Sequence, residues 1–163
     1  MKQYFVKIIV WIPVIVIGIL IFGFSNQNAT ESSGLSVKIA RQIIAVGEQW
    51  NLISMDGENS LVLIEKLQYP IRKAAHMTEY MLFAISLTAA LYVWNMRGKR
   101  LLWMAFALTA AYACTDEFHQ LFIPGRAGLV SDVVIDSIGG FIGVVISETY
   151  FRIKWKLYKI YRE

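Results

Sequence analysis

Apolar residues in this chain are gathered into four long blocks rather than spread evenly. The blocks cover residues 5–24, 74–94, 101–122 and 129–151. An α-helix needs about 20 apolar residues to cross the hydrocarbon core of a bilayer, so each block is long enough for one crossing. The pattern predicts an all-α integral membrane protein with four transmembrane helices, organised as a single domain over residues 1–163.

The first block also resembles a secretory signal peptide, because Lys2 and Lys7 stand at its start. Its apolar run exceeds the usual length of about 7–15 residues, and no clear A-x-A cleavage site follows it. We therefore expect this block to be a retained membrane anchor.

The segment between the first two blocks, residues 25–73, has a helical pattern of its own. Its apolar side chains recur at helical spacing over residues 34–50, at Leu35, Ile39, Ile43, Val46 and Trp50. Such an amphipathic helix lies in the membrane interface or covers the bundle as a lid. Residues 54–67 then predict a turn and a second short helix that ends before Pro70. A packed loop and a mobile lid are both open interpretations of this segment.

Composition supports a membrane protein. Hydrophobic residues make up 56% of the chain and charged residues only 17%, against about 25% charged in a soluble domain, and the mean hydropathy is +0.49. The net charge is +4, but the basic residues cluster beside apolar blocks, so nucleic acid is not an expected partner. The single cysteine, Cys114, permits no internal disulfide, and its apolar neighbours predict a small buried side chain.

The basic residues also predict an orientation. Loops on the cytoplasmic side of a membrane carry an excess of Lys and Arg. Ten of the sixteen basic residues fall at the two ends of the chain and in the turn between the second and third blocks: Lys2, Lys7, Arg97, Lys99, Arg100, Arg152, Lys154, Lys156, Lys159 and Arg162. Four crossings place all of these on one side. Both termini are therefore expected to be cytoplasmic, with residues 25–73 and 123–128 outside.

Polar residues in the second, third and fourth blocks lie near the ends that this topology places outside. They are Arg72, Lys73, His76, Glu79 and Tyr80 in and before the second block, Asp116, Glu117, His119 and Gln120 in the third, Arg126 in the link that follows, and Asp132 and Asp136 in the fourth. Each helix could have carried its charges at either end. Since all three carry them at the same end, we predict one polar pocket just beneath the outer surface.

The predicted pocket holds more negative than positive charge. Three cations, Arg72, Lys73 and Arg126, face five carboxylates, Glu79, Asp116, Glu117, Asp132 and Asp136. Charged groups within a membrane are costly unless they are paired or face a cavity. Protonated histidines, protonated carboxyls or a bound cation would balance the excess.

Several kinds of chemistry are compatible with these residues. Acid–base catalysis is one, and its candidates are His76, Glu79, Asp116, Glu117 and His119. Arg126 and Lys73 suit a phosphate or carboxylate. No cofactor and no metal site are predicted, because the spacings match no established zinc pattern, although a divalent cation is chemically compatible. A salt-bridge network that fixes helix register, with both histidines in packing roles, is the structural alternative.

Small residues in the fourth block predict close helix packing. Gly139 and Gly143 have the small-xxx-small spacing that lets two helices approach closely, and Gly140 and Ser147 extend this face. Glu148, near the inner end of the block, is expected to pair with the basic tail.

Three ordered motifs resemble the VanZ-like membrane proteins: RKAAHMTEY (72–80), DEFHQLFIPGR (116–126) and DVVIDSIGGFIG (132–143), with FSNQN after the first block as a weaker match. The resemblance implies a bacterial plasma membrane protein linked to glycopeptide resistance, chiefly to teicoplanin. One position departs from the family pattern, which usually has Asn where this chain has Asp136, and the carboxyl there adds charge to the pocket.

The resemblance and the pocket together favour binding of an amphiphilic ligand at the outer leaflet, either a lipoglycopeptide or a lipid-linked wall precursor, among the membrane lipids. The first alternative is a membrane-embedded enzyme that uses the His, Asp and Glu cluster on a lipid-linked substrate. A transporter ranks third, because the polar residues lie at one end and not at the midplane. The sequence leaves a homo-oligomer open.

Overall fold

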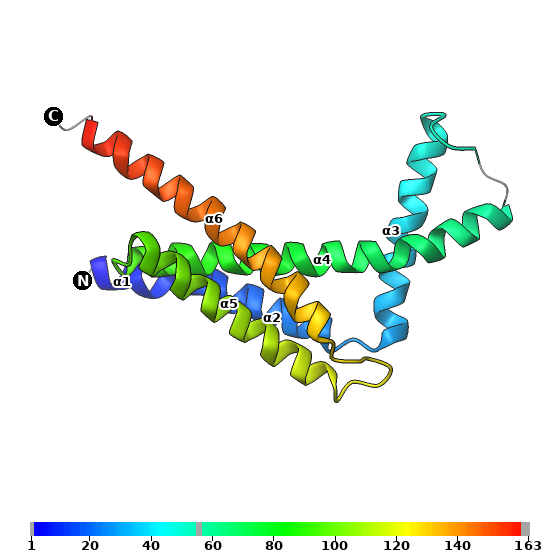
Figure 1. Cartoon of the computed structure of the whole chain (residues 1–163), viewed down its shortest axis with the longest axis horizontal. Helices are drawn as coiled ribbons and strands as arrows, with labels where there is room; N and C mark the ends of the chain where they lie inside the picture. Colours follow the sequence, from blue (N-terminus) through cyan, green and yellow to red (C-terminus); the bar gives the residue numbers. More distant parts are fainter. Residues whose placement is uncertain (1, 55–56, 161–163) are drawn as a thin grey trace.

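The computed structural model describes residues 2–54 and 57–160, and in this part of the chain all regular structure is helical. The six helices are α1 (Lys2–Ile9), α2 (Ile12–Ser25), α3 (Ala29–Gln49), α4 (Gly57–Val93), α5 (Gly98–Gln120) and α6 (Val130–Ile160). The predicted all-α class is confirmed. Helix α1 and the end of α6 lie at one end of the molecule, and α3 projects from the other (Figure 1).

The first apolar block is divided into two helices. The break lies at Val10 and Trp11, just before Pro13 in the first turn of α2. Proline has no N–H and is favoured in the first turn of a helix, where the N–H groups have no intrahelical partner. Together α1 and α2 give the apolar stretch Tyr4–Ser25, and the Tyr112 hydroxyl of α5 holds α2 by donating to the Gly18 carbonyl at 2.7 Å.

Helix α4 continues through Pro70 as one helix of 37 residues. The predicted end of a short helix before Pro70 is therefore wrong. A proline inside a helix removes one backbone hydrogen bond and favours a kink, but packing on both sides holds this helix together. Ile64 before the proline and Ile71 after it both belong to the apolar cluster between α3 and α4.

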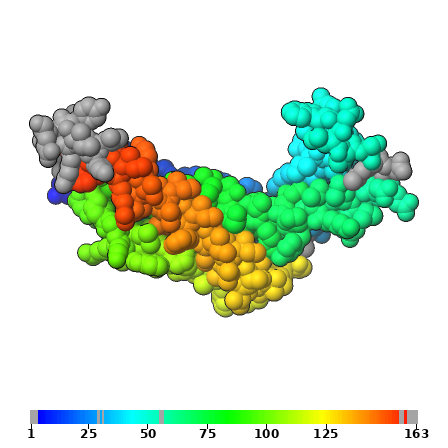
Figure 2. Space-filling model, turned by 45° about the horizontal axis from the view of Figure 1, so that its top comes forward, coloured from blue at the N-terminus to red at the C-terminus, as the bar shows by residue number. Residues whose placement is uncertain are grey.

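Helix α3 packs on α4 through a different stripe from the predicted one. Its buried apolar residues are Ala40 and Ile44. Most of the predicted apolar stripe is exposed, at Leu35, Ile43, Val46 and Trp50. Both stripes contain apolar side chains at helical spacing, and contact with α4 decides which of them is buried. In Figure 2, α3 and the first turns of α4 stand away from the remaining helices.

Close packing of α6 depends on its glycines. A Cβ atom on Gly139 or Gly143 would overlap the backbone carbonyls of Met77 or Met81 in α4, and one on Gly140 would lie 2.6 Å from Thr109 Cγ2 in α5. The predicted helix-docking role of these glycines is confirmed. The main core lies along this contact, and its largest fully buried side chain is Tyr80.

Two predictions about single residues have different outcomes. Glu148 is buried and forms an ion pair with Arg152 in the next turn of α6, as expected from its position beside the basic tail. Cys114 was predicted to be buried, but α5 carries it on its exposed side. In an apolar helix, hydrophobic neighbours in sequence do not show which face contacts the other helices.

Two stretches are long and apolar enough to cross a membrane, Tyr4–Ser25 and Val130–Trp155. Many of their large side chains are exposed, for example Ile15, Ile19 and Ile146, as expected for contact with lipid. The other two predicted spans, 74–94 and 101–122, carry polar and charged residues at one end, which shortens their apolar runs. The chain is consistent with a membrane protein, and the four-span topology stays a prediction.

Candidate functional site

The candidate site lies at one end of the bundle, which we call the polar end. Helices α2 and α5 finish there at Ser25 and Gln120, and α6 begins there at Val130. Helix α4 passes the same level with residues 72–80, the segment that carries its polar side chains. The structure therefore brings all twelve candidate residues to the same end of the bundle.

Arg126 connects the α5–α6 loop to the end of α2. Its Nε donates to the Gln27 carbonyl at 3.0 Å, and its two terminal nitrogens donate to the Phe24 carbonyl at 3.2 Å and to Gln120 Oε1 at 3.4 Å. Burial and the neighbouring Arg72 lower the pKa of Arg126 from its ordinary value, but a guanidinium stays charged at neutral pH. The planar guanidinium directs its donors toward three different acceptors.

Gln120 holds the two carboxyl groups of α5. Its side-chain nitrogen lies 3.4 Å from Asp116 Oδ2 and 3.2 Å from Glu117 Oε1, and all three side chains are buried. Glu117 also accepts a hydrogen bond from the backbone nitrogen of Leu129 at 2.9 Å. Glu117 thus fixes the residue before α6, and so the start of that helix.

Helix α4 contributes two of the basic residues, Arg72 and Lys73, and one of the two histidines, His76. Lys73 forms an ion pair with Asp132 of α6, and both side chains are mostly buried. His76 Nδ1 lies 3.8 Å from Glu79 Oε2, which is too far for a hydrogen bond but close enough for an electrostatic contact. The Lys73–Asp132 pair links α4 to α6 at the level of the polar end, whereas the His76–Glu79 contact lies within α4.

Asp136 and Tyr80 form a deeper layer of the polar end. Asp136 is 1% exposed and Tyr80 is fully buried, as is Ser25 at the end of α2. Tyr80 and Ser25 neighbour the Asp116 side chain. Three helices and the end of α2 therefore meet through hydroxyl and carboxyl groups.

His119 packs against the end of α2. Its ring stacks on Phe22 of α2, with the ring centroids 4.5 Å apart. His119 therefore contacts α2 and also interacts electrostatically with Asp116 on its own helix, whereas Gln120 turns toward the α5–α6 loop and Arg126.

Two adjoining cavities open at the polar end. The first, which we call the polar chamber, measures about 210 Å³ and is lined by Tyr69, Arg72, Lys73, His76, Gln120, Gly125, Arg126, Ala127, Leu129 and Asp132. The second, the side groove, measures about 90 Å³ and is lined by Phe24, Gln27, Ser32, Leu35, Ser36, Ile39, Ile71, Arg72, Ala75, His76, Glu79 and Arg126. The two cavities share Arg72, His76 and Arg126.

Charge is layered around the polar chamber. All three cations of the site line it, but Asp132 is its one carboxylate, and that group is already paired with Lys73. Asp116, Glu117 and Asp136 line neither cavity and are buried. The excess of carboxylates expected from the sequence therefore lies beneath the chamber, while the chamber wall is positive.

A metal ion has no preformed ligand set at this site. Among the described residues, no three His, Cys, Asp or Glu side chains are grouped closely enough to hold one. The sequence left a divalent cation open, and such an ion would need ligands other than three grouped side chains of these types.

Helix α3 contributes residues to the site that were not among the predicted candidates. Ser32 and Ser36 line the side groove together with Leu35 and Ile39. The serines are four residues apart, so they fall on one helix face, and this spacing was the available signal. Tyr69, beside the polar chamber, was also missed, because a residue next to a proline was assigned to a helix end.

One comparison with known proteins gives a match. The family model described as VanZ/LLP1 matches residues 10–151, which is most of the chain. No curated protein and no solved structure matches the chain.

Proposed function

The chain belongs to the VanZ/LLP1 family, and from that premise we propose that it binds an amphiphilic ligand with an anionic head group at its polar end. Family membership makes it a VanZ-like membrane protein associated with antibiotic resistance. The proposed ligands are a lipid-linked wall precursor or a lipoglycopeptide of the teicoplanin type. Binding would lower the access of the antibiotic to its target.

The observation that carries the proposal is a cluster of buried polar atoms without partners. In the described part of the chain, the buried side-chain atoms without a hydrogen-bond partner include Arg72 Nε, His76 Nδ1, Glu79 Oε2, His119 Nε2 and Asp136 Oδ2. All of them lie at the polar end. Buried polar groups are nearly always hydrogen-bonded, so a closed salt-bridge network is a poor account of this site. A ligand or ordered water would supply the missing partners.

The polar chamber suits an anionic head group. Arg72, Lys73 and Arg126 line it, and Arg72 Nε has no partner among the described residues. A guanidinium binds phosphate and carboxylate in bidentate fashion, with bonds stronger than those between neutral groups. A phosphate or diphosphate head is therefore the group that this wall accommodates best.

The side groove suits an apolar tail. Leu35 and Ile39 of α3 face Ile71 and Ala75 of α4 across it, with Phe24 at the end of α2. Because the groove shares Arg72 and Arg126 with the polar chamber, one molecule can place its head in the chamber and its first apolar segment in the groove. This arrangement favours an amphiphile over a soluble ion.

The topology of the proposal follows from the positions of the basic residues. Four spans with cytoplasmic termini place Lys7, Arg97 and Arg152 inside and the polar end outside. The polar end then faces the outer leaflet of the plasma membrane, where lipid-linked wall precursors meet the antibiotic. Cysteine labelling from either side of the membrane, at exposed positions such as Lys99 and Gly57, tests this orientation.

Binding is tested with the full chain in nanodiscs, using undecaprenyl diphosphate and a fluorescent teicoplanin as probes. Arg72→Gln removes a guanidinium whose Nε has no partner among the described residues, so binding is expected to weaken by about tenfold or more, the size of one charge-assisted hydrogen bond. Arg126→Ala is expected to weaken it at least as much, and His119→Ala less. Arg100→Gln, at the opposite end, is the matched control.

The same variants are then expressed in bacteria, and their susceptibility to teicoplanin is measured. The proposal fails if Arg72→Gln, Arg126→Ala and His119→Ala leave both probe binding and susceptibility unchanged in well-expressed protein. Equal loss in Arg100→Gln would also count against it, since binding would then depend on total charge.

A second candidate function is acid–base chemistry on the bound lipid. His76 and Glu79 are neighbours and both line the side groove, so a proton donor and acceptor would stand beside the ligand. Turnover distinguishes the two functions. A product detected by mass spectrometry after incubation, and lost in His76→Asn, would establish an enzyme, whereas unchanged ligand supports binding alone.

A further inference from the structure

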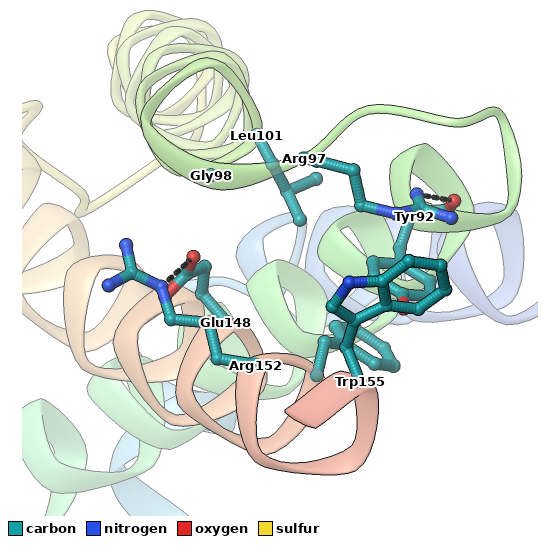
Figure 3. Close-up of a pocket in the computed structure, with 8 residues that line it drawn as sticks. Tyr92, Arg97, Gly98, Leu101, Glu148, Arg152 and Trp155 are labelled. Carbon is teal, nitrogen blue, oxygen red and sulfur yellow. Dashed lines mark hydrogen bonds and ion pairs between the residues drawn. The ribbon is translucent and has the colours of Figure 1, made fainter. Parts of the chain in front are cut away.

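A third cavity lies at the opposite end of the bundle, where α4 turns into α5 and α6 runs past. It measures about 230 Å³. Arg97 and Trp155 lie on one side of it, and Glu148 and Arg152 on the other (Figure 3). We call it the inner pocket. It has no residue in common with the polar chamber or the side groove.

The walls of the inner pocket are aromatic. Tyr92 of α4 and Phe151 of α6 stack with their ring centroids 4.0 Å apart and their planes 12° apart. Trp155 follows one turn later on α6 and is 52% exposed. Aromatic residues with one apolar and one wet side gather at membrane interfaces, so these side chains suit the glycerol and upper acyl region of a lipid.

The rim of the inner pocket carries a fixed cation. Arg97 lies over the Tyr92 ring, with its Cζ atom 3.6 Å from the ring centroid, and donates to the carbonyls of Tyr92 and Met96. Among the described residues it has no carboxylate within ion-pair distance. Its positive charge is therefore positioned by the fold but not neutralised.

The other two charged residues of the inner pocket, Glu148 and Arg152, neutralise each other. Glu148 is buried and holds Arg152 by an ion pair, as the dashed line in Figure 3 shows. Among the described residues, two cations and one carboxylate thus line the pocket. Gly98 adds open space, because a Cβ atom there would meet no other atom within 4 Å, and its positive φ of 59° favours glycine at this turn.

We propose that the inner pocket binds the phosphate head group of an anionic phospholipid from the cytoplasmic leaflet. Charge complementarity selects this occupant, since a positive rim stands above an aromatic, otherwise apolar cavity at the end of two apolar helices. Basic pockets between helices on the cytoplasmic side are recognised sites for such head groups. The inference rests on the orientation part of the proposed function and is independent of the ligand at the polar end.

The test uses the full chain in nanodiscs that contain either a brominated phosphatidylglycerol or a brominated phosphatidylcholine, each diluted into unlabelled phosphatidylcholine. Bromine quenches the fluorescence of nearby tryptophan. The difference in fluorescence between the wild type and Trp155→Phe reports on Trp155, and so on the inner pocket. Phosphatidylglycerol is expected to quench this signal at lower mole fraction than phosphatidylcholine. Inorganic phosphate at 100-fold excess over the lipid is expected to leave the quenching unchanged, and displacement by it would overturn the lipid assignment.

Two substitutions are expected to move the preference in opposite directions. Arg97→Gln removes the unpaired cation and is expected to weaken the preference for phosphatidylglycerol by about fivefold, the contribution of one basic residue near an anionic surface. Glu148→Gln releases Arg152 and is expected to strengthen it by a similar factor. A defect in folding cannot produce both signs.

Arg100→Gln is the matched control, because Arg100 is exposed at the same end but does not line the inner pocket. It is expected to keep most of the preference. If Arg97→Gln and Arg100→Gln lower the preference equally, the protein responds to diffuse surface charge and the proposal is wrong. Failure here, with normal probe binding at the polar end, would leave the proposed function intact.

Discussion

The contact between α4 and α6 supplies the sharpest test of this structure. Gly143→Ala adds one methyl group where α6 lies against the backbone of α4. The new Cβ atom would overlap the Met81 carbonyl oxygen, with the Met81 carbonyl carbon at 3.1 Å and Ala84 Cβ at 3.2 Å. Because the main obstacle is backbone, no side-chain rotation relieves the overlap, and the two helices must separate.

The expected magnitude follows from overpacking. Inserting a methyl or methylene group into a tightly packed core costs about 1–3 kcal/mol, and alanine recovers up to about 1 kcal/mol through its higher helix propensity. Because the obstacle is backbone, the cost lies in the upper part of that range, about 2–3 kcal/mol, and Gly143→Ala is expected to be destabilising by about 1–2 kcal/mol after the gain in propensity. Gly140→Ala should cost less, because its obstacle is the Thr109 side chain and not the backbone of a neighbouring helix.

Gly23→Ala is the matched control. Gly23 lies inside α2, and a Cβ atom there would meet nothing within 4 Å. Only the propensity gain then applies, so this variant is expected to equal or exceed the wild type in stability. The assay is unfolding of the full chain in mixed detergent micelles, followed by tryptophan fluorescence and helix content.

The result that would refute this reasoning is a Gly143→Ala protein as stable as wild type while Gly23→Ala loses stability. That outcome would mean that α6 does not approach α4 as described. It would also weaken the account of the polar end, because Asp132 and Asp136 are positioned by the same helix. A stability loss confined to Gly143→Ala, accompanied by weaker head-group binding, would support both.

Three further predictions concern single contacts. Tyr112→Phe removes the hydrogen bond to the Gly18 carbonyl and is expected to cost about 0.5–1.5 kcal/mol, measured by the same unfolding assay, and no loss would show that α2 is held by apolar contact alone. Lys73→Met and Asp132→Asn should each lower stability, and their double-mutant cycle should give a coupling of about 0.5–3 kcal/mol, with zero coupling contradicting the ion pair. Gln120→Met leaves two buried carboxyl groups without their shared donor, so we expect a loss of about 1–3 kcal/mol together with weaker probe binding, and unchanged values of both would contradict the bridging role.

The helical blocks were predictable because helices in lipid are selected by length and hydrophobicity, which are local properties of a sequence. The continuation of α4 through Pro70 was not predictable, because the effect of a proline on a helix depends on the residues that pack around it. The buried face of α3 was also out of reach. Leu35 and Ile44 lie on different stripes that are both apolar, and only contact with α4 decides between them.

For the polar end, topology was sufficient to bring the candidate residues to one level of the bundle. The pairing of Lys73 with Asp132 and the bridging by Gln120 depend on helix rotation and side-chain rotamers, which no spacing encodes. For the same reason, the sequence could count the charges but could not separate those that line the chamber from those beneath it.

The polar end and the inner pocket are expected to differ in ligand selectivity. The buried atoms without hydrogen bonds in the described chain all belong to the polar end, and none of them lies in the inner pocket. A site with unsatisfied buried donors and acceptors rejects a ligand that cannot match them, because the mismatch leaves those groups unpaired in both partners. The inner pocket has no such requirement, so charge and an acyl chain are sufficient for it. The polar end should therefore distinguish closely related head groups, whereas the inner pocket should accept any anionic phospholipid.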